Sequence, residues 1–460
     1  MSKQRLVIAG VSSGVGKTTF TIGLMAALGK RGLNVQGFKC GPDYIDPSFH
    51  TAVTGRISRN LDSWMFSNEV LKEVFVNGSK GADISIIEGV MGFYDGKSAN
   101  TNLGSTAEIS MLLDCPTILV VDCSKMARSA AAIVKGFQLL DPCTNIVGVI
   151  ANKVGSIGHY QIIKEAVEQE CGIAVCGYLL SDSSIRMPER HLGLVPSVER
   201  GDLNNLFLKL AELVENTIDV DQLLQLSKRK PIEVNESNSI FKRHSSQGIK
   251  LAVAKDKAFN FYYQENLDLL EAYGAECLYF SPLNGETIPE EANGLYIGGG
   301  FPELFAAELS AQSAVKQSIK QRIDQGLPTL AECGGFMYLA DSIETIDGKI
   351  HPMVGVIPGK MKMNKKLAAI GYREITGLSG NFLFHNEFTA RGHEYHYSSF
   401  HSNEAIPYAY HTKGSFGEGE EGYLTRNVIA GYTHIHFASY PALVENFIRK
   451  CMEMKKNDSQ

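Results

Sequence analysis

The sequence lacks the features that mark membrane proteins, nucleic-acid binders and disulfide scaffolds. None of its apolar runs approaches the roughly 20 residues that a membrane-spanning helix needs. Its formal net charge of -6 gives no basic footprint for nucleic acid. Its nine cysteines form no Cys-x-x-Cys pair, which argues against structural zinc and disulfides and favours the reducing cytoplasm. We therefore expect a cytoplasmic globular protein without membrane or nucleic-acid partners.

The chain also shows no internal repeat and no signal peptide. The apolar run after Lys3 and Arg5 is short and ends at Ser12, which predicts a first strand instead of a secretory segment. With 460 residues, 44% hydrophobic and 20% charged, the chain has the composition of an ordinary globular protein. Its length predicts two or three domains.

A glycine-rich segment near the start, GVSSGVGKTT, lies between a short apolar run and a helical pattern. Strand, glycine-rich loop, Lys-Thr and helix in this order are typical of a phosphate-binding loop. Glycine lets backbone N–H groups face phosphate oxygens, Lys17 reaches the β- and γ-phosphates, and the Thr18 hydroxyl binds Mg²⁺. The predicted ATP contacts in this loop are Gly14, Gly16, Lys17, Thr18 and Thr19.

The loop is one residue longer than the common form. Gly10 and Gly16 enclose five residues instead of four. This longer loop resembles that of the dethiobiotin-synthetase-like P-loop proteins, in which the γ-phosphate of ATP activates a substrate carboxylate. The alternative is a glycine-rich turn that binds nothing.

Apolar strand candidates alternate with helical patterns through the first half of the chain. This alternation predicts a parallel sheet covered by helices on both faces, with the ligand beyond the carboxyl ends of the strands. The strand candidates are residues 35–39, 84–88, 117–122, 146–152 and 174–180, and the helical patterns include residues 127–140 and 160–170.

Carboxylates gather at the predicted carboxyl ends of these strands. Asp43 and Asp46 follow one strand, and Glu88 and Asp95 end and follow another. Carboxylates beside a P-loop can hold Mg²⁺ or orient a nucleophile, but Asp43 and Asp46 also flank prolines and can be turn formers. We predict Thr18, Asp43 and Glu88 as metal ligands, and Asp46 and Asp95 as candidates for substrate contact or phosphoryl transfer.

Two further polar pairs lie near the same predicted edge. Asn152, followed by Lys153, is a candidate contact to adenine, and Asn60 with Asp62 is a candidate contact to substrate. Both pairs can equally be hydrogen-bonding residues of loops.

Residues 222–248 change in character, because polar and charged side chains dominate and apolar anchors are few. This composition predicts an interdomain linker, with a mobile loop inside one domain as the alternative. A second αβ pattern begins at Lys250 and includes an expected helix over residues 258–273. The predicted domains are residues 1–225 and 248–445, joined by a linker over residues 226–247.

The second half contains a strand that runs into Glu332-Cys333-Gly334-Gly335 and then an apolar helix. A cysteine at such a turn is typical of a nucleophile elbow, where the helix N-terminus favours the thiolate. Two histidines, His434 and His436, are expected on one face of a later strand and can supply the base. The predicted oxyanion donors are Gly299, Gly300 and Gly334. The alternative for Cys333 is a buried inert thiol.

Between the cysteine and these histidines lie segments rich in His, Arg and Tyr, residues 371–373 and 391–398. Such side chains suit a polyanionic or aromatic ligand, or they line a domain interface.

Seven motifs together closely resemble the cobyrinate a,c-diamide synthases, the glutamine-dependent amidase family of corrin biosynthesis. In chain order they are GVGKTT, KCGPDYIDPSFH, EGVMGFYDG, GGGFPELFA, ECGGFMYL, GHEYHYS and YTHIHF. The resemblance covers nearly the whole chain. It implies an α/β fold with an N-terminal P-loop synthetase domain and a C-terminal class I-type glutamine amidotransferase domain, with ATP, Mg²⁺, L-glutamine and a cobyrinate-type tetrapyrrole as cofactors and ligands.

The resemblance also implies a mechanism. A substrate carboxylate takes the γ-phosphoryl group of ATP, ammonia freed from glutamine at Cys333 displaces the phosphate, and the a and c side chains become amides. His436 aligns with the family's catalytic histidine and His434 is the second choice. No carboxylate follows in the usual His-x-Glu spacing, so the third member of the site is unassigned and the oligomeric state is open.

Relatives that act on hydrogenobyrinate or on nickel-sirohydrochlorin share these motifs and are alternatives within the same class. A different class, the partitioning or metallochaperone-type P-loop ATPases with a degenerate amidotransferase module, resembles only the first half. Cys333 together with His436 argues against that class.

Overall fold

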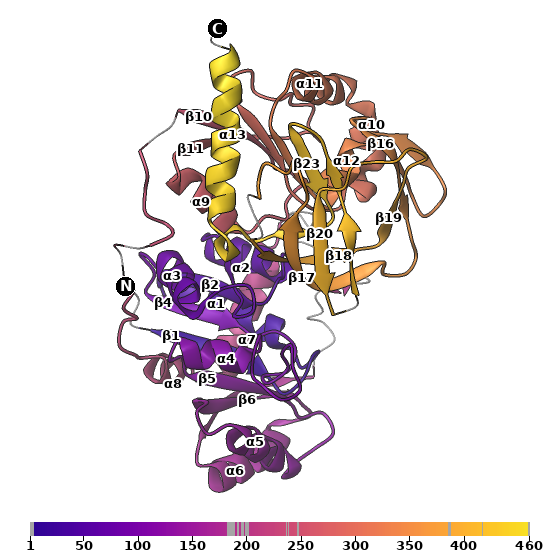
Figure 1. The fold of residues 1–460 in the computed structure, drawn as a ribbon. Helices are drawn as coiled ribbons and strands as arrows, with labels where there is room; N and C mark the ends of the chain where they lie inside the picture. The colour runs from indigo at the N-terminus through magenta and orange to yellow at the C-terminus, as the bar shows by residue number, and fades with distance from the viewer. Residues whose placement is uncertain are drawn as a thin grey trace. The chain divides into compact units, whose positions relative to one another are not determined.

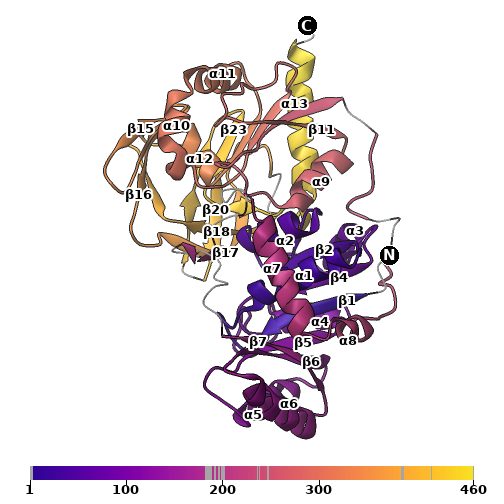
Figure 2. The same ribbon diagram turned by 180° about the vertical axis from the view of Figure 1, so that it is seen from behind.

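The computed structural model describes residues 4–181, 189–190, 193–194, 197, 202–235, 237, 239–245, 248–384, 388–415 and 417–458. The chain divides into two compact units, unit 1 (Met1–Asn235) and unit 2 (Glu236–Gln460) (Figures 1 and 2). Both are built from strands and helices, so the predicted α/β class is confirmed. Among the described residues no helix is both long enough and apolar enough to cross a membrane.

Unit 1 is organised around a seven-stranded parallel sheet with the order β3-β2-β4-β1-β5-β6-β7. Because every strand runs in the same direction, all carboxyl ends lie at one edge. The strands are β1 (Arg5–Gly10), β2 (Val35–Cys40), β3 (Arg59–Leu61), β4 (Ile84–Glu88), β5 (Thr117–Asp122), β6 (Ile146–Val154) and β7 (Ala174–Leu180); β8 (Glu189–Arg190) and β9 (Gly193–Leu194) form a separate pair. The prediction of a parallel sheet in this half of the chain is therefore confirmed.

Helices cover this sheet, with α1 beside α7 and α5 beside α6 in both views (Figures 1 and 2). Alternate residues of the strands, such as Leu6 and Ile8, pack against Phe20 and Leu24 of α1 and Val214 of α7 in one buried cluster. The helices are α1 (Lys17–Lys30), α2 (Ile45–Thr54), α3 (Asn68–Gly78), α4 (Thr106–Leu112), α5 (Ser129–Leu140), α6 (Ile157–Cys171), α7 (Asn204–Thr217) and α8 (Val220–Leu226).

The segment that comes after α8 in the chain lies beside the first residue of β1. The N–H of Arg5 donates to the Ser227 carbonyl at 3.0 Å, and Arg5 Nη1 donates to the Lys230 carbonyl at 2.8 Å. The first residues of the predicted linker therefore belong to the hydrogen-bonding pattern of unit 1. The boundaries of the two functional domains stay a prediction.

Unit 2 has a six-stranded main sheet with the order β11-β10-β12-β13-β23-β22, parallel except for β22. Its strands are β10 (Ile249–Ala254), β11 (Ala275–Phe280), β12 (Gly294–Ile297), β13 (Thr329–Glu332), β22 (Tyr423–Leu424) and β23 (Val428–Gly431). Apolar residues of β10, β12 and β23 pack with the helices α10, α11 and α12 in one buried cluster.

Two smaller sheets in unit 2 were not foreseen from the sequence. One has the order β15-β14-β16-β19 and the other β21-β20-β17-β18-β24. Their strands are β14 (Ala340–Glu344), β15 (Ile350–Pro352), β16 (Ile357–Met363), β17 (Ala369–Gly377), β18 (Ala390–His396), β19 (Ser398–His401), β20 (Tyr410–Gly414), β21 (Gly417–Glu421) and β24 (His434–Ile435). The His-, Arg- and Tyr-rich segments lie on β17 and β18 of the second sheet.

The helix expected over residues 258–273 is wrong in its first part, because α9 begins only at Gln264. The Asp256 carboxylate accepts hydrogen bonds from the N–H groups of Ala258 and Phe259, and Phe261 pairs with Gly299. These contacts hold the segment as a turn and a bridge. The helices of unit 2 are α9 (Gln264–Ala272), η3 (Pro302–Phe305), α10 (Ala306–Ala311), α11 (Ser313–Asp324), α12 (Gly334–Leu339), η4 (Phe437–Ser439) and α13 (Ala442–Asp458).

Candidate active sites

The phosphate-binding loop connects β1 to α1 in unit 1. Gly14 and Gly16 have φ angles of 73° and 93°, which glycine adopts without strain. The Asn152 amide at the end of β6 donates to the Val15 carbonyl at 2.6 Å and lies so close to Gly16 that no Cβ fits there. Thr19 lies in the first turn of α1. The loop therefore has the backbone freedom that phosphate binding requires, with Asn152 packed against it.

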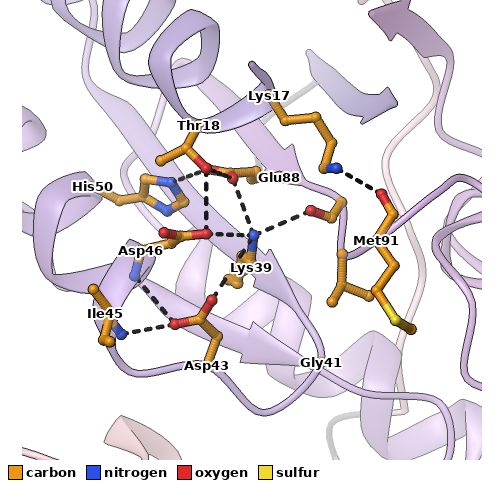
Figure 3. Close-up of polar contacts among 12 residues, drawn as sticks. Lys17, Thr18, Lys39, Gly41, Asp43, Ile45, Asp46, His50, Glu88 and Met91 are labelled. Carbon is orange, nitrogen blue, oxygen red and sulfur yellow. Dashed lines mark hydrogen bonds and ion pairs between the residues drawn. The ribbon is translucent and has the colours of Figure 1, made fainter. Parts of the chain in front are cut away.

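Lys17 is buried at the start of α1, with 8% of its surface exposed. Its ammonium donates to the Met91 carbonyl at 2.6 Å (Figure 3) and to the Ser12 carbonyl at 3.2 Å. Burial lowers the pKa of Lys17, and the nearby Lys39 ammonium lowers it further. Two lysines therefore converge on this end of the sheet.

Lys39, at the carboxyl end of β2, lies among three carboxylates (Figure 3). Its Nζ is 2.6 Å from Asp46 Oδ2, 3.0 Å from Glu88 Oε1 and 4.0 Å from Asp43 Oδ2. Lys39 is 4% exposed and Glu88 is fully buried. The strand ends thus bring together Asp43, Asp46 and Glu88, three of the four predicted carboxylates, around a lysine to which the sequence reasoning gave no role.

One ammonium cannot neutralise three carboxylates, and the pKa values reflect this. Burial opposes the charge on Lys39, but Asp46, Glu88 and Asp43 outweigh it and raise the pKa of Lys39 well above its usual range. Burial and the neighbouring Asp43 raise the pKa of Asp46 well above its usual range. Burial works against ionisation of Glu88, yet Lys39 and His50 lower the pKa of Glu88. The cluster therefore favours an additional cation.

Three oxygens of this cluster, Thr18 Oγ1, Glu88 Oε1 and Asp46 Oδ2, lie close together. Thr18 Oγ1 donates to Glu88 Oε1 at 2.5 Å and lies 3.4 Å from Asp46 Oδ2 (Figure 3). Within the described ranges no group of three or more acidic, His or Cys side chains forms a complete metal site. Mg²⁺ normally takes one or two protein carboxylates and completes its shell with phosphate oxygens and water. The hydroxyl and carboxylate oxygens here fit that partial donor set.

Other predicted polar residues hold turns. Asp43 Oδ1 accepts the N–H groups of Ile45 and Asp46 at the start of α2. The Asp95 carboxylate accepts the N–H of Gly92 at 2.8 Å. Asp43 therefore belongs both to the turn and to the Lys39 cluster. Asp95 holds a turn after β4, its charge also works against the lowering of the Lys17 pKa by burial, and its role toward substrate stays a prediction.

The second predicted pair at this edge behaves likewise. The Asn60 amide donates to the carbonyls of Gly41 and Asp43. Asp62 Oδ1 accepts the N–H groups of Trp64 and Met65. Asn60 and Asp62 thus support the loops at the carboxyl ends of β2 and β3.

The sequence reasoning also missed His50 on α2. Its Nε2 lies 2.7 Å from Glu88 Oε2, and its Nδ1 lies 3.2 Å from Ser58 Oγ. Lys39 and His50 open and close the motif KCGPDYIDPSFH, so the motif contained the signal. Only the fold places both side chains on Glu88.

The candidate site of unit 2 is built on Cys333, between β13 and α12. Cys333 has a φ of 48°, which is unusual for a residue with a side chain. Its N–H donates to the Gly431 carbonyl at 2.7 Å, and Gly335 packs so closely on Ile297 that no Cβ fits. This strained strand-to-helix turn is the geometry of a nucleophile elbow.

The thiol is buried, with 6% of Cys333 exposed. Burial raises the pKa of Cys333, and the carboxylates of Glu303 and Glu394 raise it further, while the Gly334 N–H lowers it. Cys333 Sγ lies 4.0 Å from the Tyr395 carbonyl of β18. In this environment the resting sulfur is a thiol, and a neighbouring base must activate it.

Two of the predicted oxyanion glycines, Gly299 and Gly300, follow β12, and their surroundings differ. The N–H of Gly299 donates to the Phe261 carbonyl at 3.2 Å. A Cβ built on Gly334 would lie 2.9 Å from the Gly300 nitrogen. Gly300 and Gly334 therefore lie side by side at the elbow, whereas the Gly299 amide is engaged in a bridge.

The two candidate histidines point to different surroundings. The expectation that both lie on one strand is wrong, because β24 ends at Ile435 and His436 leads into η4. The His434 ring packs against Gly299, beside the elbow glycines. His436 Nε2 lies 3.7 Å from Glu265 Oε2. His434 is therefore on the side of Gly299, and His436 is on the side of α9.

A column of rings joins the two histidines. The Tyr263 ring packs on His436 with centroids 4.2 Å apart, and its hydroxyl lies 2.7 Å from His393 Nδ1. His393 in turn stacks on His434 with centroids 4.9 Å apart. The sequence reasoning missed Glu265 and Tyr263, which lie far from the histidine pair in the chain, whereas His393 belongs to the His-rich segment 391–398 that it singled out.

Burial keeps these imidazoles neutral. It lowers the pKa of His434 to about 3, and the nearby His396 also lowers it, while Glu394 acts in the opposite direction. Burial also lowers the pKa of His436, although Glu265 opposes this.

Comparison with known proteins assigns each half of the chain to a family. Residues 6–195 match a model described as the CobQ/CobB/MinD/ParA nucleotide binding domain. Residues 250–442 match a model described as a CobB/CobQ-like glutamine amidotransferase domain. The P-loop and the cysteine elbow each lie inside the corresponding match.

Curated relatives match over nearly the whole chain. A cobyrinate a,c-diamide synthase of Priestia megaterium is 58% identical over 456 residues, 99% of each chain. One of Dehalococcoides mccartyi (strain CBDB1) is 45% identical over 98% of each chain. One of Salmonella typhimurium (strain LT2) is 41% identical over 96% of this chain and 97% of the relative.

Proposed function

The chain belongs to the family of the cobyrinate a,c-diamide synthases, and from this premise we propose that it amidates the a and c side-chain carboxylates of cobyrinate, with ATP and glutamine as co-substrates. The observation that carries the proposal is the pairing, in one chain, of a P-loop beside clustered carboxylates with a cysteine elbow beside histidines. A carboxylate is a poor electrophile at neutral pH, so ATP supplies a leaving group and glutamine supplies the nitrogen.

In unit 1 the γ-phosphoryl group of ATP passes to a substrate carboxylate. The carboxylate oxygen attacks phosphorus, ADP leaves and an acyl phosphate forms. Backbone N–H groups of the glycine loop and the Lys17 ammonium bind the phosphates, and Asn152 supports the loop. The second cation, Lys39, lies within the carboxylate cluster and is placed to stabilise the negative charge that substrate and phosphate bring together.

We assign a magnesium site to Thr18, Glu88 and Asp46, with Asp43 behind them. The assignment rests on the three converging oxygens and on the excess of negative charge around Lys39. A bound Mg²⁺ neutralises phosphate charge and orients the triphosphate. Asp43 holds the start of α2 and thereby positions Asp46.

In unit 2 the thiolate of Cys333 attacks the side-chain amide of glutamine, ammonia leaves and water then hydrolyses the thioester. Gly300 and Gly334 supply the oxyanion donors. The sequence favours His436 as the base, but the contacts favour His434, because its ring packs against Gly299, the residue before the proposed oxyanion donor Gly300. The ammonia then attacks the acyl phosphate and phosphate leaves. An active-site thiol requires a reducing environment, which supports a cytoplasmic location.

The test is the Cys333→Ala variant of the full chain, incubated with ATP, Mg²⁺, cobyrinate and either glutamine or a high concentration of ammonium. Mass spectrometry of the tetrapyrrole reports the number of amides added. We expect no product with glutamine, full diamide with ammonium, and glutamate release at background. Efficient use of glutamine by Cys333→Ala contradicts the assignment of the nucleophile.

Two controls accompany this experiment. ATP binding by Cys333→Ala, measured by calorimetry, shows that the variant is folded. Parallel incubations of the wild-type chain with hydrogenobyrinate and nickel-sirohydrochlorin test the tetrapyrrole: preferred amidation of either one overturns cobyrinate as the substrate.

A further inference from the structure

Glu88 also contacts His50, through the carboxylate oxygen that Thr18 and Lys39 do not use; the four residues are labelled in Figure 3. His50 Nε2 lies 2.7 Å from Glu88 Oε2, while Glu88 Oε1 accepts from Thr18 at 2.5 Å and from Lys39 at 3.0 Å. His50 and Glu88 are both fully buried. The two oxygens of the Glu88 carboxylate therefore have different partners. Oε1 contacts Thr18 and Lys39, and Oε2 contacts His50.

The other ring nitrogen of His50 is also held. Nδ1 lies 3.2 Å from Ser58 Oγ, and the Ser58 N–H donates to Thr51 Oγ1 of α2 at 2.9 Å. An ionised carboxylate only accepts hydrogen bonds, so Nε2 carries the hydrogen toward Glu88. In the neutral ring Nδ1 then accepts from the Ser58 hydroxyl. The chain Ser58–His50–Glu88 thus fixes the orientation of the imidazole.

The backbone makes room for this histidine. A Cβ on Gly37 of β2 would lie 2.8 Å from the His50 Cβ, so the glycine permits α2 to approach the sheet. His50 occupies the interior of α2, and Asp46 lies one turn before it on the same helix. One short helix therefore presents Asp46 and the support for Glu88 together.

We propose that His50 is a positioning residue for the phosphoryl-transfer site, which holds Glu88 Oε2 so that Oε1 and the Thr18 hydroxyl are aimed at the magnesium ion that accompanies ATP. This inference rests on the proposed function. Carboxylates that bind metals are commonly oriented by such outer partners, and the loss of one costs about tenfold to a hundredfold in metal affinity.

The experiment measures ATP binding to the full chain by calorimetry as a function of Mg²⁺ concentration, without turnover. In His50→Leu we expect the half-saturating Mg²⁺ concentration to rise about tenfold or more, while binding of ATP in EDTA is unchanged. His50→Gln places an amide N–H at the reach of Nε2 and should restore most of the Mg²⁺ affinity. Binding of Mn²⁺ in the presence of ATP can be followed by electron paramagnetic resonance. The Mn²⁺ affinity should rank wild type, His50→Gln and His50→Leu in the same order as the Mg²⁺ affinity.

Two matched variants separate positioning from packing. Ser58→Ala leaves the imidazole in place and removes only its outer partner, so a smaller rise in the same direction is expected. His159→Leu removes a histidine of α6 that contacts the Met126 carbonyl, and it should leave the Mg²⁺ dependence unchanged. If His50→Leu does not fold, the ranking of wild type, Ser58→Ala and His50→Gln carries the test.

Mg²⁺ dependence equal to wild type in His50→Leu, or a Gln variant no better than Leu, overturns the inference. If His50→Leu does not fold, the inference is overturned by equal Mg²⁺ dependence in wild type, Ser58→Ala and His50→Gln. A wild-type chain that binds ATP without any Mg²⁺ dependence instead contradicts the proposed function itself.

Discussion

At the scale of single residues, the charge balance of unit 1 depends on Lys39. Its ammonium is nearly buried and contacts Asp46 and Glu88 within 3.0 Å. Removing one partner of a buried ion pair leaves uncompensated charge and costs about 3–5 kcal/mol. We therefore expect Lys39→Met to lower the free energy of unfolding by that order in urea unfolding without Mg²⁺, and to recover part of it when Mg²⁺ is added.

The control for this prediction is Lys164→Met. Lys164 is a surface residue of α6 that pairs loosely with Glu168 at 3.9 Å. Surface substitutions of this kind change stability by about 0.5 kcal/mol or less. Equal stability of Lys39→Met and Lys164→Met would show that Lys39 is not needed to balance the carboxylates.

The two histidines of unit 2 give a second prediction at this scale. The His434 ring packs against Gly299, next to the proposed oxyanion donor Gly300, whereas His436 contacts Glu265 and Tyr263. Loss of a general base typically costs about a hundredfold or more in rate. We expect His434→Ala to reduce glutamate release by that factor and His436→Ala to reduce it less. Ammonium-dependent amide synthesis, measured on the same preparations, should stay normal in both. The reverse ranking returns the role of base to His436.

At the scale of elements, β13 carries a buried carboxylate directly before the nucleophile. Glu332 Oε1 accepts the Ile435 N–H of β24 at 2.9 Å, and the Tyr296 hydroxyl of β12 donates to Oε2 at 2.7 Å. Burial raises the pKa of Glu332 from its usual 4.5 to about 7. This one side chain therefore links β12, β13 and β24 around the elbow. At mildly acidic pH its carboxyl group is protonated in the folded chain.

The shift predicts a pH-dependent stability. Between pH 4.5 and about 7 the unfolded chain loses the Glu332 proton while the folded chain keeps it, so stability falls as the pH rises. The contribution is at most about 3 kcal/mol. Glu332→Gln keeps the shape of the side chain and an acceptor for the Ile435 N–H, and its second amide position faces the Tyr296 hydroxyl. We expect urea unfolding to show a smaller loss of stability from pH 5 to pH 8 in this variant than in wild type.

Glu418→Gln is the matched control, because Glu418 is an exposed carboxylate of β21 in the same unit. Its pH dependence should equal that of wild type. An unchanged slope in Glu332→Gln would mean that Glu332 is ionised throughout this range.

At the scale of the whole molecule, the residues proposed for the two reactions lie in separate units, Lys17 with its carboxylates in unit 1 and Cys333 with its histidines in unit 2. Lys17→Ala removes a cation from the transferring phosphoryl group, which should lower amide synthesis about a hundredfold or more with either nitrogen source. Glutamate release at Cys333 does not use that cation and should persist. Amide synthesis by mass spectrometry and glutamate release by enzymatic assay check the two halves.

This outcome is the converse of the one expected for Cys333→Ala, so the two variants form a pair. Near-normal amide synthesis in a folded Lys17→Ala chain contradicts the P-loop assignment. Loss of glutamate release in Lys17→Ala would show that the two reactions are coupled.

The sequence by itself determined the local features whose geometry depends on neighbouring residues. The strands β4, β5 and β7 match their predicted ranges, because buried parallel strands are continuous apolar runs. The P-loop and the elbow were readable because each needs glycines at fixed offsets from Lys17 or Cys333. Whole-chain motifs in a specific order were enough to identify the family.

The tertiary structure decided what depends on residues far apart in the chain. The short antiparallel strands of unit 2 are half exposed and have no long apolar runs, so their pairing is settled by packing. Lys39 and His50 meet Glu88 only because parallel strands bring their carboxyl ends to one edge. Likewise, two histidines two residues apart received different partners, Gly299 and Glu265, because the strand ends between them and the backbone turns.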